Sequence, residues 1–174
     1  MPVYRFGLSD VKVATWTAAN SYGAAVDVNA AQMFEVTLET VSAELTGDDH
    51  IVDAHSKVSG VTVRLRNGDL DPDVLAIISG ESNASSGTYD KIVFGETNRP
   101  YFALCGKVLD TGSGADTHFF IPKCKVMGNI TFRMEYGSYV VPELEIKGVY
   151  EGAANGFAMR KDYATAAVVA IPPA

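Results

Sequence analysis

A long stretch of alternating polar and apolar residues constrains this chain more than any other feature of its 174-residue sequence. The alternation runs from Phe34 to about Thr46 and again from His50 to Arg66, on either side of a polar turn. Alternation with a period of two is typical of β-strands that have one buried and one polar face. At about 3.3 Å per residue, each strand could reach roughly 40–50 Å, which is more than the core of a small domain requires. The pattern predicts a long hairpin over about residues 33–66, whose outer part contacts something outside the subunit.

Two details of the hairpin lead to further expectations. Ser59-Gly60 interrupts the alternation of the second strand, which predicts a β-bulge or bend. Opposite charges on the two strands predict cross-strand pairs, with Glu35 and Glu39 against Arg64 and Arg66. Four side chains of the second strand are expected to share one face: Ile51, Asp53, His55 and Lys57.

The segment after the hairpin carries the start and stop signals of a short helix. Asp71 suits the N-cap, Pro72 the first helical position and Gly80 the terminating position. Asp73 places a carboxylate near the positive end of the helix dipole. The apolar side chains between these ends form one stripe: Val74, Leu75, Ile77 and Ile78. We therefore expect a helix at about residues 71–79 that packs against a sheet.

The rest of the chain consists mainly of β-prone segments separated by turn-forming residues. These segments begin at Val11, Ala24, Tyr89, Tyr101, His118, Ile130 and Tyr139, with one more in the tail from Tyr163 to Ala174. Many short strands with one helix are typical of a mainly β or α+β fold. A length of 174 residues favours a single domain, preceded by an arm at about residues 1–10. We expect an antiparallel β-sandwich or a partly closed barrel, flanked by the helix.

Charge is unevenly distributed along the chain. The net charge is -7 and the isoelectric point is near 4.9, whereas a general nucleic-acid binder normally carries a basic face. Between Lys12 and Lys57 there is no basic residue. The acidic residues of that segment are Asp27, Glu35, Glu39, Glu44, Asp48, Asp49 and Asp53. The segment is either a solvated acidic surface or a face with an electrostatic role.

The two cysteines lie in separate apolar segments without the spacing of a metal or redox motif. We expect Cys105 and Cys124 to be buried free thiols in a reducing compartment. The first ten residues lack the pattern of a signal peptide, and no apolar run approaches the roughly 20 residues of a membrane span. These features predict a soluble protein made in the cytoplasm, with no membrane partner.

One short segment resembles a catalytic motif. An apolar pair followed by Asp110-Thr111-Gly112-Ser113 is similar to the active-site turn of aspartic proteases, where two carboxylates share a proton. No second Asp-Thr-Gly sequence is present, so an Asp110-dependent protease would have to be a dimer. A hairpin loop rich in turn-forming residues is the simpler interpretation.

Acidic residues and histidines near the hairpin turn are of the types that bind metal ions. The residues concerned are Asp48, Asp49, His50, Asp53 and His55. A regular strand places His50 on the face opposite Asp53 and His55, and no third ligand follows at a convincing spacing. We expect a polar hairpin tip, with no metal, no cofactor and no catalytic residue, and therefore not an enzyme.

Two segments resemble the major tail tube proteins of bacteriophages. The first, AELTGDDHIVDAHSKVSGVTVRLRNGDLDPDVLAIISG, begins at Ala43 and is similar to the long hairpin and helix of that family. The second, FFIPKCKVMGNITFRMEYGSYVVPELEIKGV, begins at Phe119 and is similar to the later strands. Together they cover about 70 of the 174 residues. The resemblance implies a β-sandwich-like subunit with one flanking helix.

The resemblance also implies a structural role in the virion. Tail tube proteins form hexameric rings whose strands join into a barrel around a channel, and the rings stack into the tube through which the genome passes. The implied partners are further copies of the chain, a tape-measure protein and a tail terminator protein, and phage DNA passes without specific binding. Assembly would take place in the cytoplasm of the bacterial host. The alternative is the inner tube protein of a type VI or other contractile secretion system, whose fold is similar.

Carried over by position, the family places two sets of residues at functional surfaces. The hairpin tip would contact a neighbouring subunit or ring through Thr46, Gly47, Asp48, Asp49, His50, Asp53, His55 and Lys57. The polar face of the first hairpin strand would line the lumen through Glu35, Thr37 and Glu39. An acidic lining would repel DNA phosphates, so that the genome slides without sticking.

Overall fold

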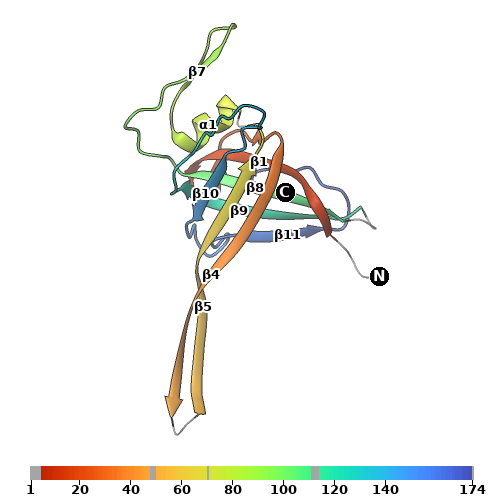
Figure 1. Ribbon diagram of the computed structural model, residues 1–174. Coiled ribbons are helices and arrows are strands. Elements are labelled where there is room, and N and C mark those ends of the chain that lie inside the picture. The colour runs from red at the N-terminus through yellow and green to blue at the C-terminus, as the bar shows by residue number, and fades with distance from the viewer. Residues whose placement is uncertain (1–4, 48–49, 70, 111–113, 174) are drawn as a thin grey trace.

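Antiparallel strands make up most of the computed structural model, which describes residues 5–47, 50–69, 71–110 and 114–173 (Figure 1). The strands before the helix are β1 (Arg5–Ala18), β2 (Ser21–Tyr22), β3 (Val26–Asp27), β4 (Ala31–Gly47) and β5 (His50–Asn67). The helix is α1 (Pro72–Ser79). The later strands are β6 (Asn83–Ser85), β7 (Asp90–Ile92), β8 (Phe102–Asp110), β9 (Asp116–Val126), β10 (Glu143–Gly148) and β11 (Met159–Tyr163). The mainly β class with a single helix is confirmed for the described residues.

Nine strands form one sheet, and β6 and β7 form a separate pair. The main strand order is β2-β1-β8-β9-β10-β5-β4, with β3 also paired to β1 and β11 to β9. Every described pairing is antiparallel. The sheet is not closed into a barrel, since its end strands β2 and β4 are not hydrogen-bonded to each other. Strand β4 therefore has one open edge.

The main sheet coils so that strands distant in its order meet across the core. A Cβ atom on Gly106 of β8 would lie 2.8 Å from Cδ1 of the Phe34 ring on β4. Real Cβ atoms essentially never come that close, so glycine lets the ring pass. The enclosed core contains fully or nearly fully buried residues of β1, β5, α1, β8, β9 and β10, among them Val11, Val13, Val61, Val63, Leu65, Val74, Ile78, Phe102, Leu104, Ile121, Leu144 and Ile146.

The helix matches its predicted signals. The Asp71 side chain accepts a hydrogen bond of 2.8 Å from the Asp73 N–H, and Pro72 is the first helical residue. Gly80 ends the helix in the left-handed conformation at φ 80°, and its N–H donates to the Ala76 carbonyl. Val74, Leu75 and Ile78 are buried against the core, with Ile77 partly buried beside them. The capping residues and the apolar stripe are confirmed.

Three predictions about segments are wrong in part. Residues 5–10, expected to form an arm, belong to β1 and pair with β8, and residues 1–4 lie outside the described residues. The segment from Ile130, which was expected to form a strand, is irregular in the structure, although apolar and polar residues alternate along it. The tail beyond Tyr163 has no strand among its described residues. It packs as irregular chain on Ala103, Cys105 and Phe120 through Val169 and Ile171.

Candidate assembly interface

The outer half of the hairpin projects away from the body as a two-stranded arm (Figure 1). Every described residue in 40–46 and 50–59 is exposed. Large apolar side chains on this arm and at its base are 42–62% exposed: Leu38, Val41, Leu45, Ile51, Val52 and Val58. Large exposed patches of apolar side chains often mark interaction sites, so this arm is a candidate interaction surface.

The register of the arm contains the expected bulge and one that was not expected. The pairing shifts between Glu39 and Thr40, which leaves Ser59 as the extra residue of β5 and confirms the prediction at Ser59-Gly60. A second shift between Leu45 and Thr46 leaves Val52 as an extra residue. Directly paired residues lie on the same face of a sheet. The second shift therefore places Ile51 on the face opposite Asp53, which corrects the expected grouping of Ile51 with the polar series.

The arm brings together only part of the predicted contact set. Thr46, His50, Asp53, His55 and Lys57 are all exposed on it. Gly47 is the last residue of β4, and Asp48 and Asp49 lie outside the described residues. Asp53, His55 and Lys57 pair with Leu45, Ala43 and Val41, so one face mixes polar and apolar side chains. Among the residues that the structure describes, no group of three potential ligands is arranged to hold a metal ion.

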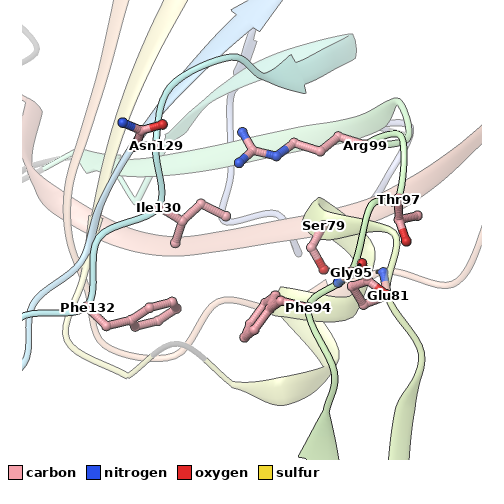
Figure 2. A pocket seen from close by; sticks show the side chains of 9 residues that line it. All are labelled: Ser79, Glu81, Phe94, Gly95, Thr97, Arg99, Asn129, Ile130 and Phe132. Carbon is pink, nitrogen blue, oxygen red and sulfur yellow. Dashed lines mark hydrogen bonds between the residues drawn. The ribbon is translucent and has the colours of Figure 1, made fainter.

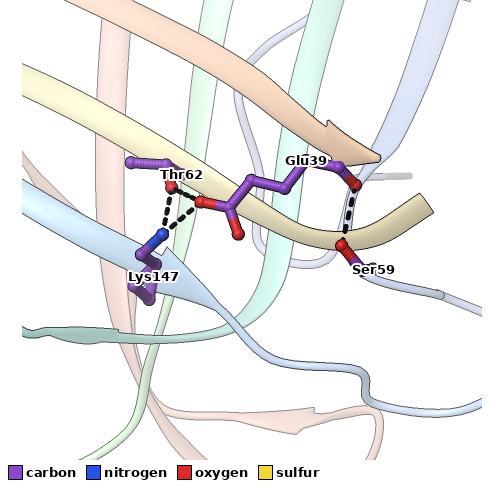
Figure 3. A network of polar contacts seen from close by, with 4 residues as sticks. All are labelled: Glu39, Ser59, Thr62 and Lys147. Carbon is purple, nitrogen blue, oxygen red and sulfur yellow. Dashed lines mark hydrogen bonds and ion pairs between the residues drawn. The ribbon is translucent and has the colours of Figure 1, made fainter. Parts of the chain in front are cut away.

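The predicted lumen residues lie on the polar face of β4, close to the base of the arm. Glu35 and Thr37 are exposed, and Glu39 is partly buried. The Glu39 carboxylate forms an ion pair with the Lys147 ammonium of β10 and accepts a 2.5 Å hydrogen bond from Thr62 Oγ1 (Figure 3). These hydrogen bonds from Lys147 and Thr62 lower the pKa of Glu39.

Acidic and basic residues alternate across this polar face. Glu35 pairs in register with Arg64, and Arg64 with Glu145. Arg66 forms a 3.0 Å ion pair with Glu143 instead of the predicted pair with a β4 glutamate, because Arg66 is opposite Met33 on β4. The predicted pairing is therefore confirmed in register for Glu35 with Arg64 and wrong for the other two residues. The face is mixed in charge, as the presence of Arg64 and Arg66 on the second hairpin strand indicated.

A second exposed apolar surface lies at the other end of the body, near α1 and the β6–β7 pair (Figures 1 and 2). It includes Phe94 and Phe132, which are 59% and 39% exposed. The Phe94 and Phe132 rings, 6.4 Å apart between centroids, face a hollow of about 440 Å³ beside Ser79. Arg99, which also lines this hollow, donates hydrogen bonds to the Val126 and Gly128 carbonyls at 3.2 and 2.7 Å.

A buried ion pair attaches the C-terminal segment to the sheet. The Lys107 ammonium lies 2.9 Å from Asp116 Oδ2 and donates to the Ala167 carbonyl at 2.7 Å. The Ala167 N–H donates to the same Asp116 oxygen at 2.5 Å. Burial raises the pKa of Asp116, but the hydrogen bonds from Ala167 and Lys107 outweigh this effect and the pKa is lowered overall.

His118 lies fully buried in the same cluster. Its ring packs against Tyr163 at 4.6 Å between centroids, and neither of its ring nitrogens has a hydrogen-bond partner in the described chain. Burial lowers the pKa of His118, and the nearby Lys107 lowers it further. The imidazole is therefore neutral at neutral pH. Sequence reasoning missed this cluster, since no local pattern links Lys107 and Asp116 to a backbone group in the tail.

The two cysteines and Asp110 all lie in strands of the main sheet. Cys105 and Cys124 are free and buried, as predicted. Burial raises the pKa of the Cys105 thiol to about 12 and also raises that of Cys124, so neither is a reactive thiolate at neutral pH. Asp110 ends β8, which pairs with β9 in a hairpin. The rest of the Asp-Thr-Gly-Ser motif lies outside the described residues.

Comparisons with protein families and with curated proteins identify no relative of this chain. No protein-family model matches the chain, and no curated protein has a similar sequence. Within the described residues, no helix is both long and apolar enough to cross a membrane. A function can be inferred from two exposed surfaces at opposite ends of the molecule. One is the hairpin arm, and the other is the surface around Phe94 and Phe132 near α1.

Proposed function

We propose that copies of this chain assemble into a tube of stacked hexameric rings, and that this tube is the tail tube of a long-tailed bacteriophage. The observation that carries the proposal is the projecting arm, in which every described residue of 40–46 and 50–59 is exposed. The arm contributes nothing to the core of its own subunit. A second copy that covers it would account for both its length and its apolar side chains.

The apolar groups of the arm favour association. Fully burying an exposed Val, Leu or Ile side chain gains about 1.5–3 kcal/mol, and a side chain that is already half buried gains about half of that. Association costs an estimated 4–15 kcal/mol in lost freedom of motion, so burying all of these side chains offsets a large part of that cost. The arm and its base carry six large apolar side chains that are at least 42% exposed: Leu38, Val41, Leu45, Ile51, Val52 and Val58.

The strand edges also support assembly over a monomeric role. Strand β4 presents one unpaired edge along Ala31–Gly47. An open edge of this length invites pairing with another chain, and closed assemblies remove such edges by placing a neighbour on them. Rings whose subunits pair through their sheets would protect the part of β4 that lies in the body in this way.

The polar face of β4, β5 and β10 is the proposed lining of the channel, with Glu35, Thr37 and Glu39 facing the lumen. Each carboxylate there has a basic neighbour, as with Glu39 and Lys147 or Glu143 and Arg66. A lining with paired charges offers no excess cations to phosphates. In this proposal DNA passes because the acidic groups are accompanied by basic ones, so that the repulsion expected from an acidic lining is weaker.

Electron microscopy of the purified protein tests the proposal directly. We expect the unaltered chain to form tubes or stacked rings and the double variant Val41→Asp/Leu45→Asp to remain dispersed. Both side chains are more than half exposed, so the variant should unfold with a free energy within about 0.5 kcal/mol of the unaltered protein.

A control places one such charge elsewhere. Val168 is 82% exposed and lies in the C-terminal segment, which packs on the body through Val169, so Val168→Asp should still form tubes. Dispersed monomers of the unaltered chain, or normal tubes from the double variant, would contradict the proposed role of the arm. Protein that forms no tubes and loses a proteolytic activity in Asp110→Asn would instead support the dimeric protease alternative.

The inner tube of a type VI or other contractile secretion system is the second candidate, because it would use the same arm and edges. The neighbouring genes separate the two. Adjacent reading frames for a tape-measure protein and a tail terminator protein are expected for a phage tail, whereas genes for a secretion apparatus would favour the alternative.

A further inference from the structure

The segment of residues 130–136 has the pattern of a strand and no strand partner. Ile130, Phe132, Met134 and Tyr136 alternate with the polar residues Thr131, Arg133 and Glu135. This alternation is typical of a strand with one apolar face. In the structure the segment is irregular, and residues 131–136 are exposed.

The backbone of this segment is also largely unpaired. Nearby backbone hydrogen bonds run from the Met127 N–H to the Glu145 carbonyl and from the Ser138 N–H to the Glu135 carbonyl. Within the described chain, no backbone hydrogen bond joins residues 130–134 to another residue. A segment with strand periodicity and free backbone groups is suited to adding itself to the edge of another sheet.

The open edge of β4 in the arm is the matching surface. It offers unpaired backbone groups beside exposed apolar side chains such as Val41 and Leu45. Its described residues 40–46, with 50–59 of β5, approach the roughly 20–30 residues that form one side of a standard protein interface. Phe132, Met134 and Tyr136, which are 39–107% exposed, supply aromatic and sulfur-containing groups that are enriched at such interfaces.

The two surfaces lie at opposite ends of the subunit. The arm points away from the body at one end, and residues 130–132 lie beside the end of α1 at the other (Figures 1 and 2). A contact between two different surfaces is head-to-tail, so the same contact can repeat along one direction without closing on a pair. This arrangement suits a stack of rings and not a symmetric dimer.

We propose that residues 130–136 of one copy become a β-strand by pairing with the open β4 edge in the hairpin arm of a second copy. The inference rests on the proposed function and names the surface that receives the arm. Strand formation on binding places Phe132, Met134 and Tyr136 on the apolar side chains of the arm. The segment stays irregular in the isolated subunit because its partner edge belongs to another molecule.

Proline substitutions test the contribution of the strand backbone separately from that of the side chains. In a strand, adjacent N–H groups point to opposite sides, so Arg133→Pro and Met134→Pro together remove the donor on either side. Neither N–H is hydrogen-bonded to another backbone group that the structure describes, so both variants should fold as stably as the corresponding Arg133→Ala and Met134→Ala controls. We expect at least one proline variant to raise the concentration needed for tube formation tenfold or more relative to its alanine control.

Crosslinking tests which surfaces meet. The native cysteines are fully buried, so a bismaleimide should join only introduced thiols. Mixing a Ser42→Cys copy with an Arg133→Cys copy of different mass, and allowing them to assemble, should give a crosslinked heterodimer. Ser42→Cys mixed with Thr17→Cys, on the exposed end of β1, is the control and should give at least tenfold less.

The outcomes distinguish the two proposals. Tubes that form normally from both proline variants, or equal crosslinking of Ser42→Cys to Arg133→Cys and to Thr17→Cys, would overturn the strand-addition inference while leaving the tube function intact. If the unaltered protein forms no tubes under any condition, the proposed function fails and the inference fails with it.

Discussion

At the scale of single residues, the least expected feature is the polar cluster beneath the C-terminal segment. Asp116 is 2% exposed and His118 is fully buried, yet both belong to a strand that the sequence suggested to be apolar. The Lys107 ammonium and the Ala167 backbone satisfy Asp116 Oδ2, whereas the His118 nitrogens remain without partners among the described residues. A buried polar group without a partner costs stability, and the cost grows if the group becomes charged.

This cluster predicts a loss of stability in mildly acidic solution. Burial and Lys107 lower the folded-state pKa of His118 below its ordinary value of 6.5, despite opposing effects of Asp116 and Asp10. The unfolded chain therefore binds a proton at a higher pH than the folded chain, and the free energy of unfolding falls as the pH drops below about 6.5. The lowered pKa of Asp116 acts in a more acidic range, below 3.8.

Urea unfolding at a series of pH values measures the effect. We expect the unaltered chain to lose stability between pH 6.5 and 5, and His118→Phe to show a flatter profile because it keeps a ring against Tyr163 without a titrating group. The slope with pH is the readout, so a constant cost of repacking does not affect the conclusion. An unchanged slope in His118→Phe would mean that another group is responsible.

At the scale of elements, the contact between β4 and β8 determines how far the sheet coils. The Phe34 ring occupies the space above Gly106 that any larger residue would need. Because the two strands are separated by β9, β10 and β5 in the sheet order, this contact joins the two halves of the sheet across the core.

The contact predicts a compensating pair of substitutions. Gly106→Ala should lower the free energy of unfolding by about 1–3 kcal/mol, since the added methyl group collides with the Phe34 ring in a packed site. Phe34→Leu removes part of the ring and should recover at least half of that loss when combined with Gly106→Ala. A double-mutant cycle by urea unfolding measures the coupling, and strictly additive effects would show that the two residues do not meet.

At the scale of the whole molecule, the body and the arm are energetically separate. The core lies between the coiled halves of the sheet and under α1, whereas the outer arm has no buried residue in 40–46 or 50–59. A part that buries nothing in its own subunit can be altered without loss of the fold.

Shortening the arm tests this separation. Replacing residues 41–57 by Asn-Gly joins the remaining hairpin strands through a two-residue turn. We expect the free energy of unfolding to change by less than about 1 kcal/mol and tube formation to be lost. Circular dichroism with urea unfolding measures the first and electron microscopy the second, and a shortened chain that fails to fold would show that the arm supports the body after all.

The sequence by itself determined the features that depend on neighbouring residues. The long hairpin follows from alternation, the bulge from Ser59-Gly60, and the helix from the capping residues Asp71 and Gly80. Each of these signals acts over a few positions, because backbone conformation responds first to local side chains.

Only the tertiary structure decided the features that depend on distant partners. Residues 130–136 alternate as clearly as β4 does, but a strand requires a second strand for its N–H and C=O groups, and none of the described strands pairs with this segment. Glu39 has Lys147 as its ion partner, and Asp116 is bonded to Ala167, across separations that no local pattern encodes. The fold class and the presence of both charges on the polar face could therefore be predicted from the sequence, whereas the partners of Glu39 and Arg66 and the exposed end near α1 could not.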